Sequence, residues 1–172
     1  MRDLKENEIE CKISQIDERG LALLLYKTAR TDAQILDETY GEMNWKNHYD
    51  EVKGNMYCTI EVWDKEKGQW ISKQDCGVES AFGDKEKGEA SDAFKRAGFK
   101  WGIGIELYTS PFIYISSDKC KIEMNKGKYV CYDKFKVEKI VTQDKKIRAI
   151  SIRNEKTEKR VFVWKSKDYK EE

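Results

Sequence analysis

The chain has 172 residues, of which 38% are charged and 39% apolar, and its 33 Lys plus Arg against 32 Asp plus Glu give a net charge of +1. That length supports one domain or a domain with a small appendage, and an aromatic content of 12% argues against a disordered chain. No stretch approaches the ~18 apolar residues of a membrane span, and residues 1–10 are acidic and lack the pattern of a signal peptide. We therefore expect a cytoplasmic protein that does not bind membranes.

Two segments with spaced apolar residues open the chain. Residues 8–25 form an amphipathic segment that is broken at Gly20. Thr31 and Gln34 then have the spacing of a capping box, and apolar side chains follow at helical spacing as far as Gly41, a typical stop. We predict a helix that begins at Thr31 and ends before Gly41.

The hydrophobic period changes from helical to alternating at Met56. Cys58, Ile60 and Val62 follow at every second position, which predicts a half-buried strand. Residues 64–68 are polar and end in a glycine, and residues 69–78 can return as a second strand. The sequence therefore predicts a β-hairpin over residues 56–78.

A second helix is predicted over residues 84–101, because small and aromatic residues gather on one face at 100° per residue. That face holds Ala90, Phe94, Ala97 and Trp101, and the opposite face holds Lys95, Arg96, Phe99 and Lys100. Glycines at positions 98, 102 and 104 are expected to end the helix, and residues 107–115 to be extended. Antiparallel strands joined by polar turns are predicted over residues 128–132, 135–141, 147–153 and 160–164.

The net charge of +1 is the average of two unlike parts. Residues 1–118 hold 16 basic and 23 acidic residues, a balance of −7, whereas residues 119–172 hold 17 and 9, a balance of +8. Such an asymmetry suggests a polyanion partner for part of the chain. A solvated, lysine-rich β-surface would give the same counts, so both interpretations stay open.

The residue types that carry catalysis form no recognisable pattern. His48 is the only histidine, and the five cysteines lie far apart without a CxxC pair, so neither a zinc site nor a disulfide framework is indicated. Gly83 and Gly88 have the spacing of a phosphate-binding loop but lack its Lys and Ser/Thr. Acidic pairs such as Glu89 and Asp92 have no spacing that requires a metal. We predict no catalytic residue, no metal site and no cofactor.

The basic face of the second predicted helix is a better candidate for binding. Lys95, Arg96 and Lys100 lie within one and a half turns, with Phe99 between them. Phosphate oxygens need several cationic donors along a backbone, and an exposed aromatic ring offers a surface for base stacking. A basic face that only keeps the helix soluble is the alternative interpretation.

The same segment resembles a known family. The run Asp92-Ala93-Phe94-Lys95-Arg96-Ala97, continued by Phe99-Lys100-Trp101-Gly102-Ile103-Gly104 and Leu107-Tyr108, is similar to the characteristic helix of the single-strand annealing proteins. These include the eukaryotic Rad-fifty-two protein and the Sak-type annealases of bacteriophages. Two further segments resemble the family in the expected order, Glu38-Thr39-Tyr40-Gly41 with Trp45, and Cys76-Gly77-Val78-Glu79-Ser80. The resemblance covers about residues 22–115.

This resemblance implies an α+β fold, with a β-hairpin and antiparallel sheet packed on helices over residues 1–118 and a basic, β-rich C-terminal section over residues 119–172. It also implies a homo-oligomeric ring or helical filament with single-stranded DNA in a basic groove. By resemblance Lys95 and Arg96 occupy two DNA-binding positions, and Lys100 stands in for a further basic position that is Phe99 here. Arg30 lies one residue from a matching position ahead of the first helix. Lys67, or more weakly Lys65, corresponds to a hairpin lysine of a second DNA site.

The expected function is ATP-independent binding and annealing of single-stranded DNA in homologous recombination and DNA repair, in the manner of a bacteriophage protein in the host cytoplasm. A recombinase or a host single-strand binding protein is the expected protein partner. Two alternatives stay open. One is a single-stranded DNA-binding protein that does not anneal strands, and the other is a metal-dependent nuclease built on the scattered acids.

Overall fold

The computed structural model describes residues 1–78 and 85–169, and the chain forms two compact units. The first unit contains residues 1–2 and 27–104, and the second contains residues 3–26 and the residues from 105 onward. Antiparallel strands and two α-helices among the described residues make the chain α+β, as predicted. The predicted division at residue 118 lies inside the second unit, because residues 3–26 and 105–118 supply strands to the same sheet as the C-terminal residues.

Helix α1 (Ala29–Tyr40) of the first unit begins two residues before its predicted start. Its N-cap is Thr28, whose hydroxyl oxygen accepts a hydrogen bond from the backbone N–H of Thr31 at 3.3 Å. The predicted capping box of Thr31 and Gln34 is therefore wrong, since the extended backbone that an N-cap needs occurs at Thr28 and Thr31 already lies inside the helix. Gly41 ends the helix as predicted, with φ at 86°.

Three antiparallel strands, β3 (Trp45–Val52), β4 (Asn55–Asp64) and β5 (Gln69–Cys76), form the sheet of the first unit. Strands β4 and β5 confirm the predicted hairpin. Strand β3 was not predicted, because most of its side chains are polar and exposed and show no alternation. It pairs with β4 along its whole length. The two strands are joined by a tight turn at Lys53 and Gly54, both of which have positive φ.

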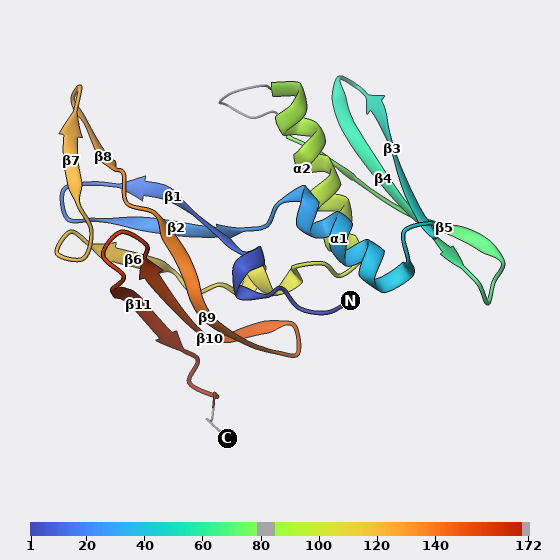
Figure 1. The fold of residues 1–172 in the computed structure, drawn as a ribbon. Coiled ribbons are helices and arrows are strands. Elements are labelled where there is room, and N and C mark those ends of the chain that lie inside the picture. Colours follow the sequence, from blue (N-terminus) through green and yellow to red (C-terminus); the bar gives the residue numbers. More distant parts are fainter. Residues whose placement is uncertain (79–84, 170–172) are drawn as a thin grey trace. The chain divides into compact units, whose positions relative to one another are not determined.

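Helix α2 (Lys85–Lys100) lies against this three-stranded sheet (Figure 1). The predicted apolar pattern is confirmed, because Phe94 and Ala97 of the helix are buried. Cys58, Ile60 and Val62 of β4 are each no more than 4% exposed. The predicted first residue of this helix, 84, and the last two residues of the hairpin-end motif, 79 and 80, lie outside the described residues.

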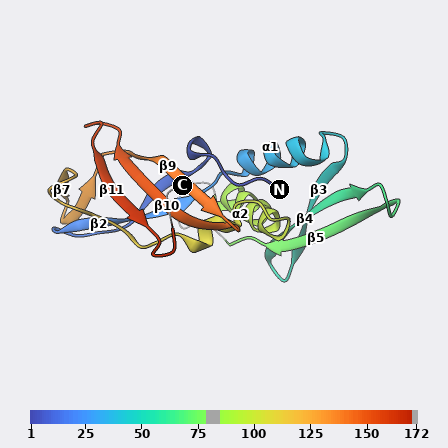
Figure 2. The ribbon, with the colours of Figure 1, turned by 90° about the horizontal axis from the view of Figure 1, so that it is seen from below.

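A six-stranded antiparallel sheet organises the second unit, in the order β11-β10-β9-β1-β2-β6. Its strands are β1 (Glu10–Ile16), β2 (Gly20–Tyr26), β6 (Ile113–Ser116), β9 (Phe135–Gln143), β10 (Lys146–Asn154) and β11 (Arg160–Lys165). Figure 2 shows β9, β10 and β11 side by side. A separate hairpin consists of β7 (Ile122–Asn125) and β8 (Lys128–Cys131), and two 3-10 helices are η1 (Glu6–Glu8) and η2 (Ile105–Thr109).

The four predicted C-terminal strands are confirmed as β8 to β11, whereas three other expectations need correction. The amphipathic segment of residues 8–25 is two strands, and Gly20 begins the second of them. Residues 107–115 are not extended throughout, because η2 precedes β6. Strand β7 was not predicted.

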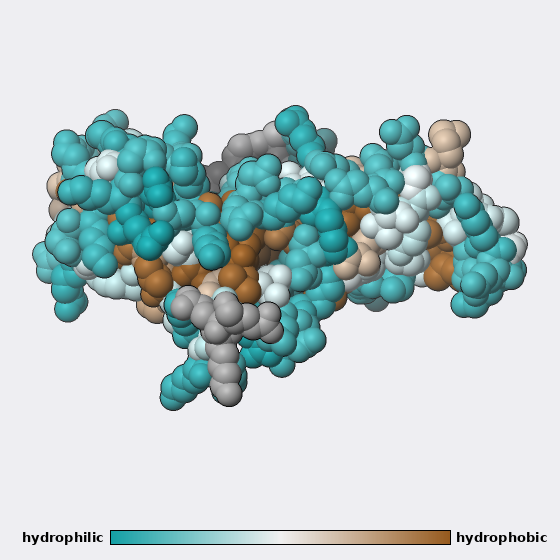
Figure 3. All heavy atoms as spheres, turned by 60° about the horizontal axis from the view of Figure 1, so that its bottom comes forward, coloured by the Kyte–Doolittle hydropathy of each residue, from teal (hydrophilic) through white to brown (hydrophobic). Residues whose placement is uncertain are grey.

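Hydrophilic residues cover most of the face drawn in Figure 3. No helix in the described part of the chain is long and apolar enough to cross a membrane.

Candidate nucleic-acid interface

The docking of α2 determines which of its side chains reach solvent. The indole Nε1 of Trp101 donates a hydrogen bond to the carbonyl oxygen of Ile60 at 3.2 Å, and the ring of Phe94 lies 6.1 Å from that of Trp45. These contacts hold the apolar side of the helix against the sheet. The predicted basic side consequently faces outward, with Arg96 and Lys100 exposed and Lys95 half-buried.

One carboxylate lies between two of these cations. Asp75, on β5, places its oxygens 3.5 Å from the guanidinium of Arg96 and 3.6 Å from the Nζ of Lys100. Lys95 lies 4.0 Å from Asp92, one helical turn earlier. Because Asp75 is shared, the cations near it outnumber the carboxylates, and the surface keeps a positive balance.

Lys73 joins this group and was missed in the sequence. Its Nζ donates a hydrogen bond to the carbonyl oxygen of Lys100 at 2.8 Å and lies 4.5 Å from the ring centroid of Trp101. A cation at the C-terminus of a helix satisfies a free carbonyl group and interacts favourably with the helix dipole. The sequence does contain an indication of Lys73, because Lys73 and Asp75 are two residues apart on a strand and therefore lie on the same face. We call Lys73, Lys95, Arg96 and Lys100 the α2 cationic cluster.

A buried ion pair lies next to the cluster. Lys27 donates a hydrogen bond from Nζ to Asp32 Oδ2, and both side chains are no more than 1% exposed. The same ammonium donates to the carbonyl oxygen of Lys95 at 3.2 Å, so it ties the start of α1 to the middle of α2. Burial raises the pKa of Asp32 to about 6, against the opposing effect of the Lys27 charge. Sequence reasoning gave no sign of this pair, because lysine is rarely buried.

Gly98 makes room for that pair. A Cβ atom added at Gly98 would collide with Oδ2 of Asp32. Gly98 was predicted to help end the helix, but it lies inside α2, two residues before the last one. Its missing side chain serves the close approach of the two helices.

Phe99 is not the exposed aromatic that the sequence suggested. Its ring is half-buried, and the Nζ of Lys27 lies 4.3 Å from the ring centroid in a cation–π contact. The helical wheel placed Phe99 on the solvent side because it takes no account of a second helix. In the single chain the ring of Phe99 is therefore not exposed in the way that base stacking requires.

The remaining predicted residues lie apart from the cluster. Arg30 is exposed on the first turn of α1, about 160° around the helix from Asp32, and within the described residues no hydrogen bond or ion pair joins it to the cluster. Lys67 lies in the exposed loop between β4 and β5, 3.5 Å from Asp64, and Lys65 lies in the same loop. The length of β5 separates this loop from Asp75 by roughly 20 Å. Of the cations predicted from the sequence to bind DNA, the structure thus brings together Lys95, Arg96 and Lys100.

Two observations concern metal ligands and thiol groups in the described residues. No group of three or more His, Cys, Asp or Glu side chains that could hold a metal ion occurs in residues 1–78 and 85–169. Burial raises the pKa of Cys58 to about 11 and that of Cys120 to about 12, so both thiols stay protonated near neutral pH.

Comparison with known proteins adds no assignment. No protein-family model, no curated protein and no solved structure matches this chain. The function is therefore inferred from the geometry and charge of the chain together with the resemblance of its α2 segment.

Proposed function

We propose that the protein binds single-stranded DNA and anneals complementary strands without ATP, in homologous recombination or DNA repair. The observation that carries this proposal is the α2 cationic cluster, in which three cations of α2 and one of β5 are accompanied by two carboxylates, Asp75 and Asp92. Lys95 and Lys100 are about 7.5 Å apart along the helix axis, so their cations can contact different phosphates of one strand.

The mechanism needs only charge and exposure. Cations that neutralise phosphates lower the repulsion between two DNA strands, and base pairing itself supplies the free energy of annealing. A contact limited to phosphates leaves the base edges free for a second strand. No nucleophile or cofactor takes part in such a process.

Assembly strengthens this contact. One cluster neutralises only a few phosphates and would bind DNA weakly at physiological salt. Repetition of the cluster in a homo-oligomeric ring or helical filament would produce a continuous basic path along the strand. Electron microscopy of the purified protein with and without an oligonucleotide tests this step, and a strict monomer in both samples would contradict it.

Annealing of two complementary fluorescent oligonucleotides tests the function. The wild-type chain should accelerate the appearance of energy transfer relative to protein-free DNA. The variant Lys95→Gln/Arg96→Gln should lose most of this acceleration, whereas Lys126→Gln/Lys128→Gln, which removes two exposed lysines from the β7–β8 hairpin, should retain it. Slower annealing than in free DNA would instead indicate a DNA-binding protein that protects single strands. Cleavage of labelled DNA with Mg²⁺ or Mn²⁺ would indicate a nuclease.

A further inference from the structure

The second unit contains a cleft with a strongly cationic lining. It lies between residues 118–121, which follow β6, and the turn that joins β10 to β11, and its volume is about 450 Å³. Ligand pockets of proteins commonly measure 300–1,000 Å³. Its charged lining residues are the cations Lys119, Lys121, Lys156, Lys159 and Arg160 and the carboxylates Asp118 and Asp133.

The β10–β11 turn is held in place by a buried amide. Asn154 is fully buried, and its Nδ2 donates a hydrogen bond to Asp133 at 3.0 Å. Its side-chain oxygen accepts hydrogen bonds from the backbone N–H groups of Lys156 at 2.9 Å and Thr157 at 3.4 Å. Asp133 also accepts a hydrogen bond from the N–H of Lys121 at 2.9 Å, so one carboxylate links the two walls of the cleft. The cationic lining is therefore presented by an ordered frame.

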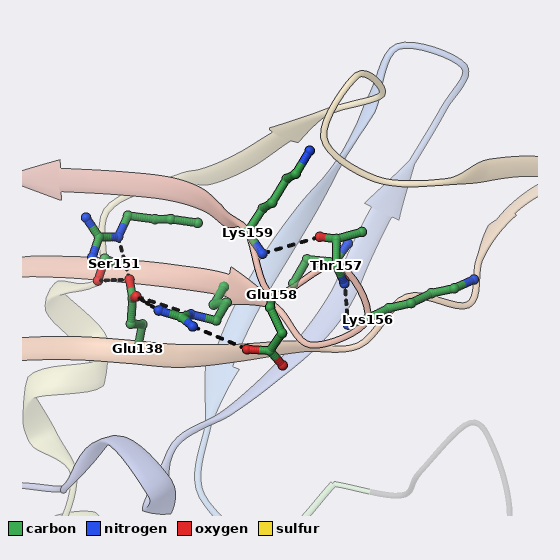
Figure 4. Close-up of polar contacts among 9 residues, drawn as sticks. Glu138, Ser151, Lys156, Thr157, Glu158 and Lys159 are labelled. Carbon is green, nitrogen blue, oxygen red and sulfur yellow. Dashed lines mark hydrogen bonds and ion pairs between the residues drawn. The ribbon is translucent and has the colours of Figure 1, made fainter.

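Three carboxylates near this turn already have partners, and a fourth, Glu155, lines a different cleft. Glu138 accepts hydrogen bonds from Arg153, Arg160 and Ser151, and Glu158 lies 3.2 Å from Arg153 (Figure 4). The carboxylate of Asp118 accepts a hydrogen bond from Ser116, and Lys121 is paired with Glu123.

Lys156 and Lys159 differ from their neighbours in this respect. Both are exposed, and within the described residues no side-chain hydrogen bond or ion pair engages either ammonium group. Figure 4 shows their side chains extending away from the turn, on either side of Thr157. Arg153 and Arg160, in contrast, donate hydrogen bonds to Glu138. The guanidinium groups near the turn are thus neutralised by Glu138, whereas the ammonium groups of Lys156 and Lys159 are available to an external anion.

We infer that this cleft binds the phosphodiester backbone of single-stranded DNA, so that the second unit adds its own phosphate contacts to those of the α2 cationic cluster. This inference rests on the proposed function for the identity of the polyanion. Two ammonium groups and the hydroxyl of Thr157 supply the donors that phosphate oxygens require, and neither base edges nor an aromatic ring is needed. The excess of positive charge in residues 119–172 then has a binding role in addition to its effect on solubility.

The salt dependence of binding to a fluorescent 30-residue oligo(dT) tests the inference in the full chain. The slope of the logarithm of the binding constant against the logarithm of the salt concentration is negative. Its magnitude decreases by about 0.7 for each single-strand phosphate that the protein no longer neutralises. Lys156→Gln/Lys159→Gln removes two cations and should therefore flatten the slope by about 1.4. Lys126→Gln/Lys128→Gln, with the same change in charge on another turn of the same unit, should keep the wild-type slope. Unchanged thermal unfolding temperatures would show that both variants fold.

The outcomes separate this inference from the proposed function. If the wild-type chain binds and Lys156→Gln/Lys159→Gln has the same slope as the control variant, the inference is overturned while the proposed function stands. If Lys156→Gln/Lys159→Gln flattens the slope but Lys95→Gln/Arg96→Gln does not, the cleft is supported and the α2 assignment falls. If the wild-type chain does not bind the oligonucleotide, both are overturned.

Discussion

The ammonium of Lys27 and the carboxylate of Asp32 form a buried ion pair directly beside the backbone of Lys95, and the same ammonium bonds to the carbonyl oxygen of Lys95. The start of α1 therefore helps to position the exposed cations of α2. A buried pair of this kind adds little net stability, because desolvation of both charges offsets their attraction. Removal of one partner is a different matter, since the other charge then stays buried alone.

Lys27→Met should destabilise the fold by about 3–5 kcal/mol, because Asp32 is left without its countercharge. Lys27→Met/Asp32→Leu replaces the whole pair by apolar groups and should recover much of that stability. Urea unfolding at neutral pH measures both variants. A double variant that is less stable than Lys27→Met would show that the pair itself is a net source of stability, contrary to this prediction.

Gly98→Ala should destabilise the protein although alanine is the better helix former. The added methyl group collides with Asp32, and overpacking of this kind typically costs about 1–3 kcal/mol, against a propensity gain of at most ~1 kcal/mol. Asp32→Ala removes the colliding oxygen, so the effects of Gly98→Ala and Asp32→Ala should be less than additive in a double-mutant cycle. A more stable Gly98→Ala variant would contradict the close approach of the two helices.

Much of the fold could be predicted wherever one face of an element is covered. The alternation through Cys58, Ile60 and Val62 identified the β4–β5 hairpin because α2 buries one face of β4. Strand β3 could not be found in this way, since most of its side chains are exposed and polar and only its pairing with β4 makes it a strand. The start of α1 was misplaced because the spacing of Thr31 and Gln34 resembles a capping box, whereas the extended backbone that an N-cap needs occurs at Thr28.

The candidate site was predictable only in part. Helical spacing alone put Lys95, Arg96 and Lys100 on one side of α2. Asp75, the partner of Arg96 and Lys100, lies on another element, and it is brought there together with Lys73 by the hairpin and by the docking of α2 on it. The same docking, together with α1, covers Phe99 with the ammonium of Lys27, which no periodicity within a single helix can indicate.

Asp75→Asn should increase the affinity for single-stranded DNA. The substitution removes the carboxylate that partly neutralises Arg96 and Lys100, so these two side chains present more positive charge to phosphates, although Lys100 still donates a hydrogen bond to the carbonyl oxygen of Gln74. Titration of labelled oligo(dT) should show tighter binding and a steeper salt dependence than for the wild-type chain. Glu42→Gln makes the same change in net charge at an exposed residue after α1 and should have a smaller effect. Equal gains in the two variants would indicate a response to net charge alone.

The stability of the second unit should fall in acid because of Glu138. Hydrogen bonds from Arg160 and Arg153 lower the pKa of Glu138 to about 2, so the folded carboxylate binds a proton less readily than the unfolded one. Above a pH of about 4.5 the group is ionised in both states and its stabilising effect is complete, and this effect is lost as the pH falls from about 4.5 toward 2. Urea unfolding at several pH values in this range should show a shallower decline for Glu138→Gln than for the wild-type chain. Arg160→Gln removes the strongest partner and should give an intermediate decline, because Arg153 still holds the carboxylate. Parallel declines in all three proteins would mean that this carboxylate does not couple protonation to folding.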